Sequence, residues 1–295
     1  MKAPLFTGSG TAIVTPFQNG RPDLDTFSRL IELQYAGGTS AIIVCGTTGE
    51  AATLTKAEHE ALYRRAVIRS AGRMRVIAGI GSNDTQKALD MATLAADCGA
   101  DGVLMVTPYY NKTTQAGLIE HFTYVADHAA LPVIVYNVPS RTGIGIEPET
   151  YAVLAQHPNI NGVKEASGNL AAFARTKALC GEQLAFWSGN DADTVAMMAL
   201  GAKGVISVAS NIVPDVVARL CRLCAEGDFA AASLLNERYM DLFTVLFREV
   251  NPIPVKTAMA MLGRCPGEMR LPLVPMQADH RKELAACLLR HGILM

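Results

Sequence analysis

Short, continuously apolar segments alternate with longer segments of helical periodicity along most of this 295-residue chain. Each apolar segment is flanked by Gly, Pro or Asn, which is typical of a strand buried on both faces of a parallel sheet. The pattern predicts eight such strands, at Thr11–Val14, Ala41–Cys45, Arg75–Ile80, Gly102–Val106, Val133–Tyr136, Asn161–Lys164, Ala185–Trp187 and Gly204–Val208.

Between the strands, apolar residues recur every three or four positions, as they do on one face of an amphipathic helix. This periodicity predicts helices at Asp25–Ala36, Lys56–Ala71, Thr85–Cys98 and Thr114–Ala129. Asp84 can cap one of these helices, and Thr55 precedes Glu58 in the order of a capping box. No G-x-G-x-x-G motif follows the first strand, so a dinucleotide-binding open sheet is disfavoured. We therefore expect a closed (β/α)8 TIM barrel.

The chain after the eighth predicted strand contains only helical patterns. They predict helices at Pro214–Ala225, Asp228–Val250, Pro254–Leu262 and Lys282–His291. We interpret the first of these as the helix that closes the barrel. Residues 1–225 would then form the catalytic (β/α)8 barrel, and residues 226–295 a C-terminal helical extension.

Composition excludes several classes of partner. The 26 basic and 27 acidic residues give a net charge of −1, so no overall field favours nucleic acid or an anionic membrane. No apolar run approaches the ~20 residues that span a bilayer, and Met1–Gly10 has no apolar core of a secretory signal. The seven scattered cysteines suit a reducing compartment, so we expect a cytoplasmic protein.

Metal and redox chemistry find little support in the sequence. Cys221 and Cys224 form a C-x-x-C pair, but a predicted helix contains both and no further ligands stand nearby. We interpret them as two helix thiols, and Asp191 and Asp193 as the acidic first turn of a helix. No histidine follows a strand, and neither a Walker loop nor an H-E-x-x-H motif is present. We expect no metal and no external cofactor.

Polar residues gather just after the predicted strands, where a barrel enzyme carries its active site. Lys164 is the only lysine that ends an apolar strand. Partial burial there would lower its pKa and leave a neutral amine, which attacks carbonyl groups to form an imine. The alternative is a structural lysine that reaches the barrel mouth or pairs with Glu165.

Three further groups strengthen the catalytic interpretation. Tyr136 ends the neighbouring strand, and its hydroxyl can shuttle protons during imine formation, although a lumen-lining tyrosine is the alternative. Thr47 and Thr48 lie in a glycine-bracketed turn whose amides and hydroxyls can hold a carboxylate, or merely cap a helix. Arg141 can bind a second carboxylate through two hydrogen bonds, unless it is an ordinary surface arginine.

Four segments together resemble the dihydrodipicolinate synthase family, which belongs to the class I aldolase superfamily that includes N-acetylneuraminate lyase. They are Gly46–Glu50, Tyr136–Gly143, Val163–Gly168 and Asn251–Lys256. The resemblance implies that pyruvate forms a Schiff base with Lys164 and attacks L-aspartate 4-semialdehyde as an enamine. The product would be 4-hydroxy-tetrahydrodipicolinate, on the route to diaminopimelate and lysine.

The resemblance also implies roles for individual residues. Thr47, Tyr110 and Tyr136 match the proton relay, and Thr48 matches a residue that binds the pyruvate carboxylate. Arg141 matches the arginine that recognises the semialdehyde carboxylate. The family further implies backbone contacts to pyruvate from Gly189 and Ile206. A homotetramer, built as a dimer of dimers in which Tyr110 reaches a neighbouring site, would follow.

Many members of the family bind lysine as an inhibitor at the dimer interface. The matching positions here are Ala52, Lys56, His59, Asn83, Lys87 and Tyr109. Sensitive enzymes usually carry a His and a Glu where this chain has Lys56 and Lys87. Two cations would repel the ammonium groups of lysine, so we expect weak or absent inhibition.

Two other functions remain possible from the sequence. A sister aldolase, acting on N-acetylneuraminate or on a 2-keto-3-deoxy sugar acid, would share Lys164 and Tyr136. Such enzymes typically lack an arginine at Arg141 and more often show Ser-Thr in place of Thr47-Thr48. A non-catalytic paralogue that only binds a keto acid would usually have lost one of Lys164, Tyr136 and Thr47.

Overall fold

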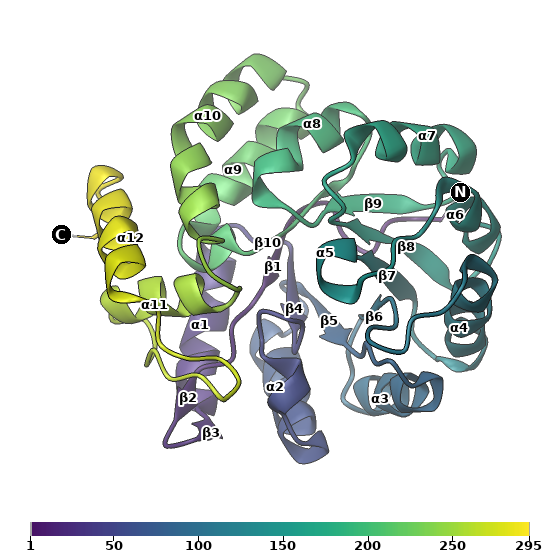
Figure 1. Cartoon of the computed structure of the whole chain (residues 1–295), viewed down its shortest axis with the longest axis horizontal. Coiled ribbons are helices and arrows are strands. Elements are labelled where there is room, and N and C mark those ends of the chain that lie inside the picture. Colours follow the sequence, from purple (N-terminus) through teal and green to yellow (C-terminus); the bar gives the residue numbers. More distant parts are fainter. Residues whose placement is uncertain (1, 295) are drawn as a thin grey trace.

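The structure is a computed structural model that describes residues 2–294, and its centre is a closed barrel of eight parallel strands (Figure 1). Each strand pairs with its neighbours in chain order, and the first strand closes the barrel against the last. The strands are β1 (Gly8–Ala12), β4 (Ala41–Val44), β5 (Arg75–Gly79), β6 (Gly102–Val106), β7 (Val133–Asn137), β8 (Ile160–Glu165), β9 (Ala185–Ser188) and β10 (Gly204–Ser207). The predicted (β/α)8 fold is confirmed.

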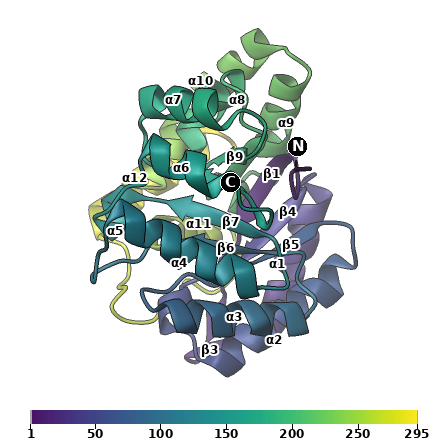
Figure 2. The same cartoon turned by 90° about the vertical axis from the view of Figure 1, so that its right-hand side faces the viewer.

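Helices surround this barrel, and Figure 2 shows α3, α4 and α6 covering the side that faces the viewer. A short hairpin of β2 (Phe17–Gln18) and β3 (Arg21–Pro22) follows β1. The helices are α1 (Leu24–Ala36), α2 (Lys56–Ser70), α3 (Thr85–Asp97), α4 (Gln115–His128), α5 (Pro139–Thr142), α6 (Pro148–Leu154), α7 (Leu170–Cys180), α8 (Thr194–Ala199), α9 (Pro214–Ala225), α10 (Phe229–Val245), α11 (Ile253–Met261) and α12 (Ala278–Arg290). Three 3-10 turns complete the described chain, at Ala51–Thr53, Asp191–Asp193 and Ala209–Asn211.

Sequence periodicity placed most elements within one residue, with three differences. The first strand spans Gly8–Ala12 rather than Thr11–Val14, and it includes Gly10, where a Cβ would lie 2.7 Å from the Phe6 ring. Helix α10 ends at Val245, before the predicted Val250, and α12 begins at Ala278, before the predicted Lys282. The polar first turn of α12 carries no apolar period, so periodicity missed it. The capping box of Thr55 with Glu58 and the cap of Asp84 are both present.

Side chains on alternate strand positions point into the barrel and form a lumen cluster that includes Ile134, Tyr136, Trp187 and Ile206. Strand alternation therefore places Lys164 on the lumen side as well, because it is the register partner of Tyr136. Gly162 makes room in the lumen, since a Cβ there would lie 2.7 Å from the Trp187 ring. A larger apolar cluster fills the space between the barrel and its helices.

Helices α10, α11 and α12 lie together at one side of the barrel (Figure 1). We propose that residues 1–225 form the barrel and that residues 226–295 form an extension. Two side chains of this extension, Asn251 and Lys256, hydrogen-bond the turn that follows β4. The extension therefore contributes directly to the mouth of the barrel.

Candidate active site

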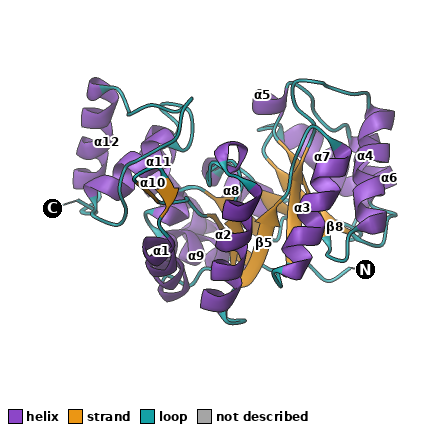
Figure 3. Cartoon of the chain, turned by 90° about the horizontal axis from the view of Figure 1, so that it is seen from below, coloured by secondary structure: helices purple, strands orange, loops and turns teal. Residues whose placement is uncertain are grey.

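A cavity of about 590 Å³ opens at the C-terminal ends of the strands. Thr47, Tyr136 and Arg141 line it from the barrel side, and Asn251 lines it from the extension. In Figure 3 the strands form the centre of the molecule, and α5, which follows the C-terminal end of β7, lies at one end of the barrel. The cavity therefore occupies the end of the barrel at which the sequence placed the reaction.

Lys164 lies near the end of β8 and is only 6% exposed. Burial is the main cause that lowers the pKa of its amine; with the charge of Asp191 opposing this effect and that of Arg141 adding to it, the pKa is about 7. Unlike Lys256, Lys164 has no carboxylate partner in an ion pair among residues 2–294. A substantial share of the amine is therefore neutral near pH 7 and can act as a nucleophile.

Pairing of Lys164 with Glu165, one alternative considered from the sequence, is wrong. The Glu165 carboxylate accepts hydrogen bonds from Asn137 Nδ2 at 3.0 and 3.1 Å, Tyr151 Oη at 2.8 Å and the Ser167 amide at 2.7 Å. Adjacent strand residues point to opposite faces, so Glu165 faces the helices while Lys164 faces the lumen. These bonds tie the end of β8 to β7 and fix the position from which Lys164 extends.

Tyr136 ends the lumen face of β7, directly opposite Lys164 in the strand register. The Lys164 Nζ atom lies 4.3 Å from the centre of its ring. Burial is the main cause that raises the pKa of the Tyr136 hydroxyl; with the charge of Arg141 opposing this effect and that of Glu165 adding to it, the pKa is about 12. Tyr136 is therefore protonated at neutral pH and is available as a proton donor next to the amine.

The turn after β4 brings Thr47 and Thr48 to the barrel mouth. Thr48 is buried, whereas Thr47 is exposed to the cavity. Gly49 and Glu50 donate backbone hydrogen bonds inside the turn, but the amides of Thr47 and Thr48 have no acceptor among residues 2–294. Free amides and hydroxyls in one tight turn are suited to binding a carboxylate.

Arg141 lies on α5 and extends over the same cavity. Its Nη2 donates to the backbone oxygen of Asn251 at 3.4 Å, a long hydrogen bond that leaves most of the guanidinium free. A free guanidinium at the cavity wall can bind a second carboxylate.

The two positions expected to offer backbone contacts also lie at this end. Gly189 follows β9, and its amide donates to the Glu165 oxygen at 2.7 Å. A Cβ on Gly189 would lie 2.5 Å from the Ala166 Cβ, so only glycine fits there. Ile206 is fully buried in the lumen cluster, opposite Gly10.

The acidic turn after Gly189 contains a buried carboxylate, that of Asp191. Asp191 lies in the first turn, as the sequence predicts, but its carboxylate does not cap that turn. It accepts hydrogen bonds from the Ser207 hydroxyl and from the amides of Val208 and Ala209 at 3.0 Å. Burial raises the pKa of this carboxyl group. Asp191 therefore joins the ends of β9 and β10 near Lys164.

Tyr110 lies apart from the other expected site residues. Its side chain is 92% exposed, its backbone has a positive φ of 69°, and it does not line the cavity. Within one chain the structure therefore does not bring Tyr110 to Lys164.

Most positions of the expected lysine site line the same cavity as Thr47, Tyr136 and Arg141. They are Ala52, Lys56, His59, Lys87 and Tyr109. Asn83 does not line it, and its backbone oxygen accepts from Asn111 Nδ2 at 2.9 Å. Burial lowers the pKa of His59, which is therefore neutral at pH 7.

Sequence reasoning missed the contacts that the extension makes with the turn after β4. Asn251 Nδ2 donates to Thr48 Oγ1 at 2.9 Å, and Lys256 Nζ donates to Glu50 Oε1 at 2.5 Å. The segment Asn251–Lys256 had been noted only for its resemblance to a family. The burial of Lys256 and Glu50 is evident only in the structure, and nothing local in the sequence identified them as partners.

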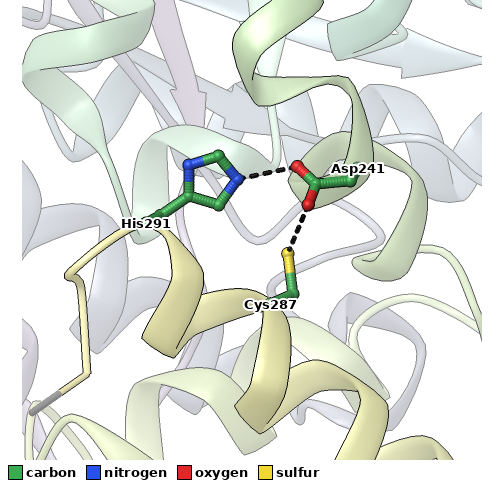
Figure 4. A group of neighbouring side chains, drawn as sticks. All are labelled: Asp241, Cys287 and His291. Carbon is green, nitrogen blue, oxygen red and sulfur yellow. Dashed lines mark hydrogen bonds and ion pairs between the residues drawn. The ribbon is translucent and has the colours of Figure 1, made fainter.

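Among residues 2–294 one group of side chains has the composition of a metal site. Asp241 on α10 contacts Cys287 on α12 and His291 just after it (Figure 4). His291 Nε2 lies 2.7 Å from Asp241 Oδ1, and Arg290 donates to Asp241 Oδ2 at 2.9 Å. The arginine already neutralises the carboxylate, so we interpret the group as an ion-paired junction between α10 and α12.

The C-x-x-C pair is also structural. Cys221 and Cys224 are free, buried thiols on α9, and burial raises the pKa of both. Protonated, enclosed thiols are poor nucleophiles and poor metal ligands.

Comparison with known proteins adds to this geometry. The sequence model of the Dihydrodipicolinate synthetase family matches residues 5–291. The chain belongs to this family. A relative from Alkaliphilus oremlandii, named 4-hydroxy-tetrahydrodipicolinate synthase, is 50% identical over 280 residues, which cover 95% of this chain and 97% of that protein. The resemblance predicted from the four segments is therefore confirmed.

Two solved structures of this family are similar in fold. The chloride-inhibited dihydrodipicolinate synthase from Acinetobacter baumannii, complexed with pyruvate, is 39% identical with a TM-score of 0.96 and covers 98% of this chain and 99% of its own. The enzyme from Cyanidioschyzon merolae, with lysine bound, is 41% identical with a TM-score of 0.95, covering 99% and 100%. No helix within residues 2–294 is long and apolar enough to cross a bilayer.

Proposed function

We propose that this member of the dihydrodipicolinate synthetase family condenses pyruvate with L-aspartate 4-semialdehyde to 4-hydroxy-tetrahydrodipicolinate, towards diaminopimelate and lysine. The observation that carries the proposal is the buried Lys164, which forms no ion pair within residues 2–294 and lies beside the Tyr136 ring at the end of the barrel lumen. The names of full-length relatives support the same reaction.

The reaction begins at the neutral amine of Lys164. Its nitrogen attacks the ketone carbon of pyruvate to give a carbinolamine, which loses water to form an imine. A proton lost from the pyruvate methyl group converts this imine to an enamine. The enamine carbon then attacks the aldehyde of the second substrate. Finally, the amino group of that substrate displaces Lys164 and closes the ring, which returns the free lysine.

Tyr136, whose ring lies beside the reacting nitrogen, would act as the proton donor and acceptor. Its raised pKa keeps it protonated between steps, so it can give a proton to the departing hydroxyl of the carbinolamine. Thr47, on the cavity wall, would pass protons towards solvent. Tyr110 would complete the relay from a neighbouring subunit, which agrees with its exposed side chain.

Two groups would hold the substrate carboxylates. The free amides of the turn, with the Thr48 hydroxyl, suit the carboxylate of pyruvate. They can donate hydrogen bonds to it without adding a further charge to the site. Backbone groups at Gly189 and Ile206 would complete this pocket. Arg141 would bind the carboxylate of the semialdehyde.

The alternatives are less well supported. The chain keeps an arginine at the mouth and Thr-Thr in the turn, where sister aldolases usually differ. The relatives named above carry the synthase name rather than that of a sister aldolase. All three groups that a non-catalytic paralogue would lose, Lys164, Tyr136 and Thr47, are present.

We further propose that the enzyme works without an external cofactor, since the lysine amine itself activates the ketone. We expect a cytoplasmic homotetramer arranged as a dimer of dimers. Its small-molecule partners are the two substrates, and we expect no nucleic-acid or membrane partner.

Trapping with borohydride tests the proposal. The protein is incubated with pyruvate, reduced, and analysed by intact mass and peptide mapping. We expect one reduced pyruvate adduct per chain, on Lys164. Replacing borohydride with aspartate semialdehyde should then give the cyclic product, whereas sister aldolase substrates should not react. An adduct on another lysine, or none, would contradict the proposed mechanism.

A further inference from the structure

We propose that Asn251 is a positioning residue for the bound keto acid: its side-chain amide fixes the Thr48 hydroxyl as a hydrogen-bond donor to the substrate carboxylate. The inference rests on the proposed function and adds a group from the C-terminal extension to it. Asn251 is buried, lines the cavity and lies just before α11.

The direction of one hydrogen bond carries the argument. Asn251 Nδ2 donates to Thr48 Oγ1 at 2.9 Å, so the hydroxyl oxygen uses a lone pair and keeps its own proton. A threonine hydroxyl has one proton to donate. No acceptor among residues 2–294 takes the proton of Thr48. A carboxylate, which only accepts hydrogen bonds, is the ligand that such a hydroxyl suits.

The same residue also contacts the other carboxylate-binding group of the cavity. The backbone oxygen of Asn251 accepts from Arg141 Nη2 at 3.4 Å. Asn251 therefore stands between the threonine turn on one side and the arginine of α5 on the other. Through its amide and its carbonyl it sets the spacing between the two sites proposed for carboxylates.

A buried ion pair holds Asn251 in place against the turn. Lys256, five positions further along the chain, donates to Glu50 Oε1 at 2.5 Å and to the Thr15 oxygen at 2.9 Å. Glu50 lies two residues after Thr48 in the same turn, and Lys256 is fully inaccessible to solvent. The extension thus contacts the turn at two points. Because the ion pair already orders this segment, the hydrogen bond of Asn251 costs little additional conformational entropy.

The Oδ1 atom of Asn251 adds a second observation. It is buried and has no hydrogen-bond partner among residues 2–294. An unsatisfied buried oxygen costs free energy, so an amide that keeps this orientation indicates that its other end, Nδ2, has the more important partner, the Thr48 hydroxyl.

The test uses the concentration of pyruvate that half-saturates the borohydride-trapped adduct on Lys164. This readout needs no second substrate. We expect N251A to raise that concentration about fivefold to tenfold, the effect of losing one organised hydrogen bond. N251D should raise it further, because an aspartate would take the Thr48 proton and repel the carboxylate. N251A combined with T48V should be no worse than T48V alone, because both act through one hydroxyl.

A matched control separates positioning from general loss of stability. Asn159 Nδ2 donates to three backbone oxygens, those of Ala126, Ala129 and Leu131, next to the start of β8. N159A should lower the thermal midpoint while leaving the half-saturating pyruvate concentration unchanged.

The outcomes separate this proposal from the proposed function. If wild-type protein gives an adduct on Lys164 but N251A traps pyruvate at unchanged concentrations, the role of Asn251 is overturned and the reaction stands. Additive effects of N251A and T48V would overturn it equally. Absence of the wild-type adduct on Lys164 would remove both.

Discussion

The ammonium nitrogen of Lys164 lies 4.3 Å from the centre of the Tyr136 ring, and the two residues are register partners across β7 and β8. The backbone itself therefore sets the relation between the proposed nucleophile and its proposed proton donor. The hydrogen bonds of Glu165 to Asn137 and Tyr151 fasten the same strand pair on its outer face. Burial of Lys164 in the lumen then supplies the desolvation that lowers the pKa of its amine.

Imine formation should depend on pH through Lys164. Its pKa of about 7 means that the amine is mostly protonated below that pH and neutral above it. The rate of adduct formation with pyruvate should therefore rise about tenfold per pH unit below the inflection and level off above it. Rapid-quench borohydride trapping across the pH range measures this profile, and an inflection near the ordinary lysine value of about 10 would contradict it.

Arg141 offers a check on the cause of that inflection. Its positive charge lowers the pKa of Lys164, so R141Q should move the inflection to higher pH. R141K keeps the charge and should leave the inflection in place, although binding of the second substrate would weaken.

Removing the Tyr136 hydroxyl should slow the reaction without unfolding the barrel. In Y136F the ring still fills its place in the lumen cluster, so the thermal midpoint should change little. Loss of a positioned proton donor should lower kcat by about 10²- to 10⁴-fold. Steady-state kinetics and a thermal melt measure the two effects, and a large loss of stability would instead indicate a structural role.

The fold and the juxtaposition of Tyr136 and Lys164 could be predicted from the sequence, because both follow local rules. Eight apolar segments define the strands, and strand alternation turns Tyr136 and Lys164 to the same side. The position of a lysine at the end of a buried strand predicts that its amine is desolvated. The assignment of Gly10 to the first strand was harder to predict. In a sequence a glycine usually indicates a turn, and the close Phe6 ring that explains this one is known only from the structure.

The support around the centre could not be predicted, because it consists of contacts between distant segments. Asn251 and Thr48 are 203 positions apart, and Lys256 and Glu50 are 206 apart. No periodicity or motif spacing relates such pairs. Likewise, sequence adjacency suggested that Glu165 pairs with Lys164, whereas the pleat of the strand turns them to opposite faces.

Lysine should inhibit this enzyme weakly or not at all. Lys56 and Lys87 both line the cavity at the positions expected to bind lysine, and each would repel a bound ammonium group. The nearest acidic neighbour of Lys87 is Asp84 at 3.7 Å, too long a contact to neutralise it fully. Activity should persist in millimolar lysine. The K56H/K87E variant should acquire inhibition, and titration calorimetry can measure the binding.

Breaking the ion pair between Lys256 and Glu50 should destabilise the protein strongly. Both side chains are essentially inaccessible to solvent, at 0% and 1% exposure. Replacement in K256M leaves a buried carboxylate without its cation, which costs about 3–5 kcal/mol. Adding E50Q removes that charge and should recover part of the loss. Denaturant unfolding of K256M and K256M/E50Q measures the difference in their free energies of unfolding. Equal values would argue against a buried, charged Glu50 in K256M.

Tyr110 should act in the site of a neighbouring subunit. It is 92% exposed and does not line the cavity of its own chain, although the family resemblance implies a role for it in the proton relay. Y110F and K164A should each be nearly inactive alone. In a mixed dimer, the site with an intact Lys164 in the Y110F chain would receive Tyr110 from the K164A chain. Mixing the two inactive variants under conditions of subunit exchange should therefore restore activity, to at most half the wild-type value per dimer. If Tyr110 served its own chain, every site in the mixture would lack one group and activity would stay absent.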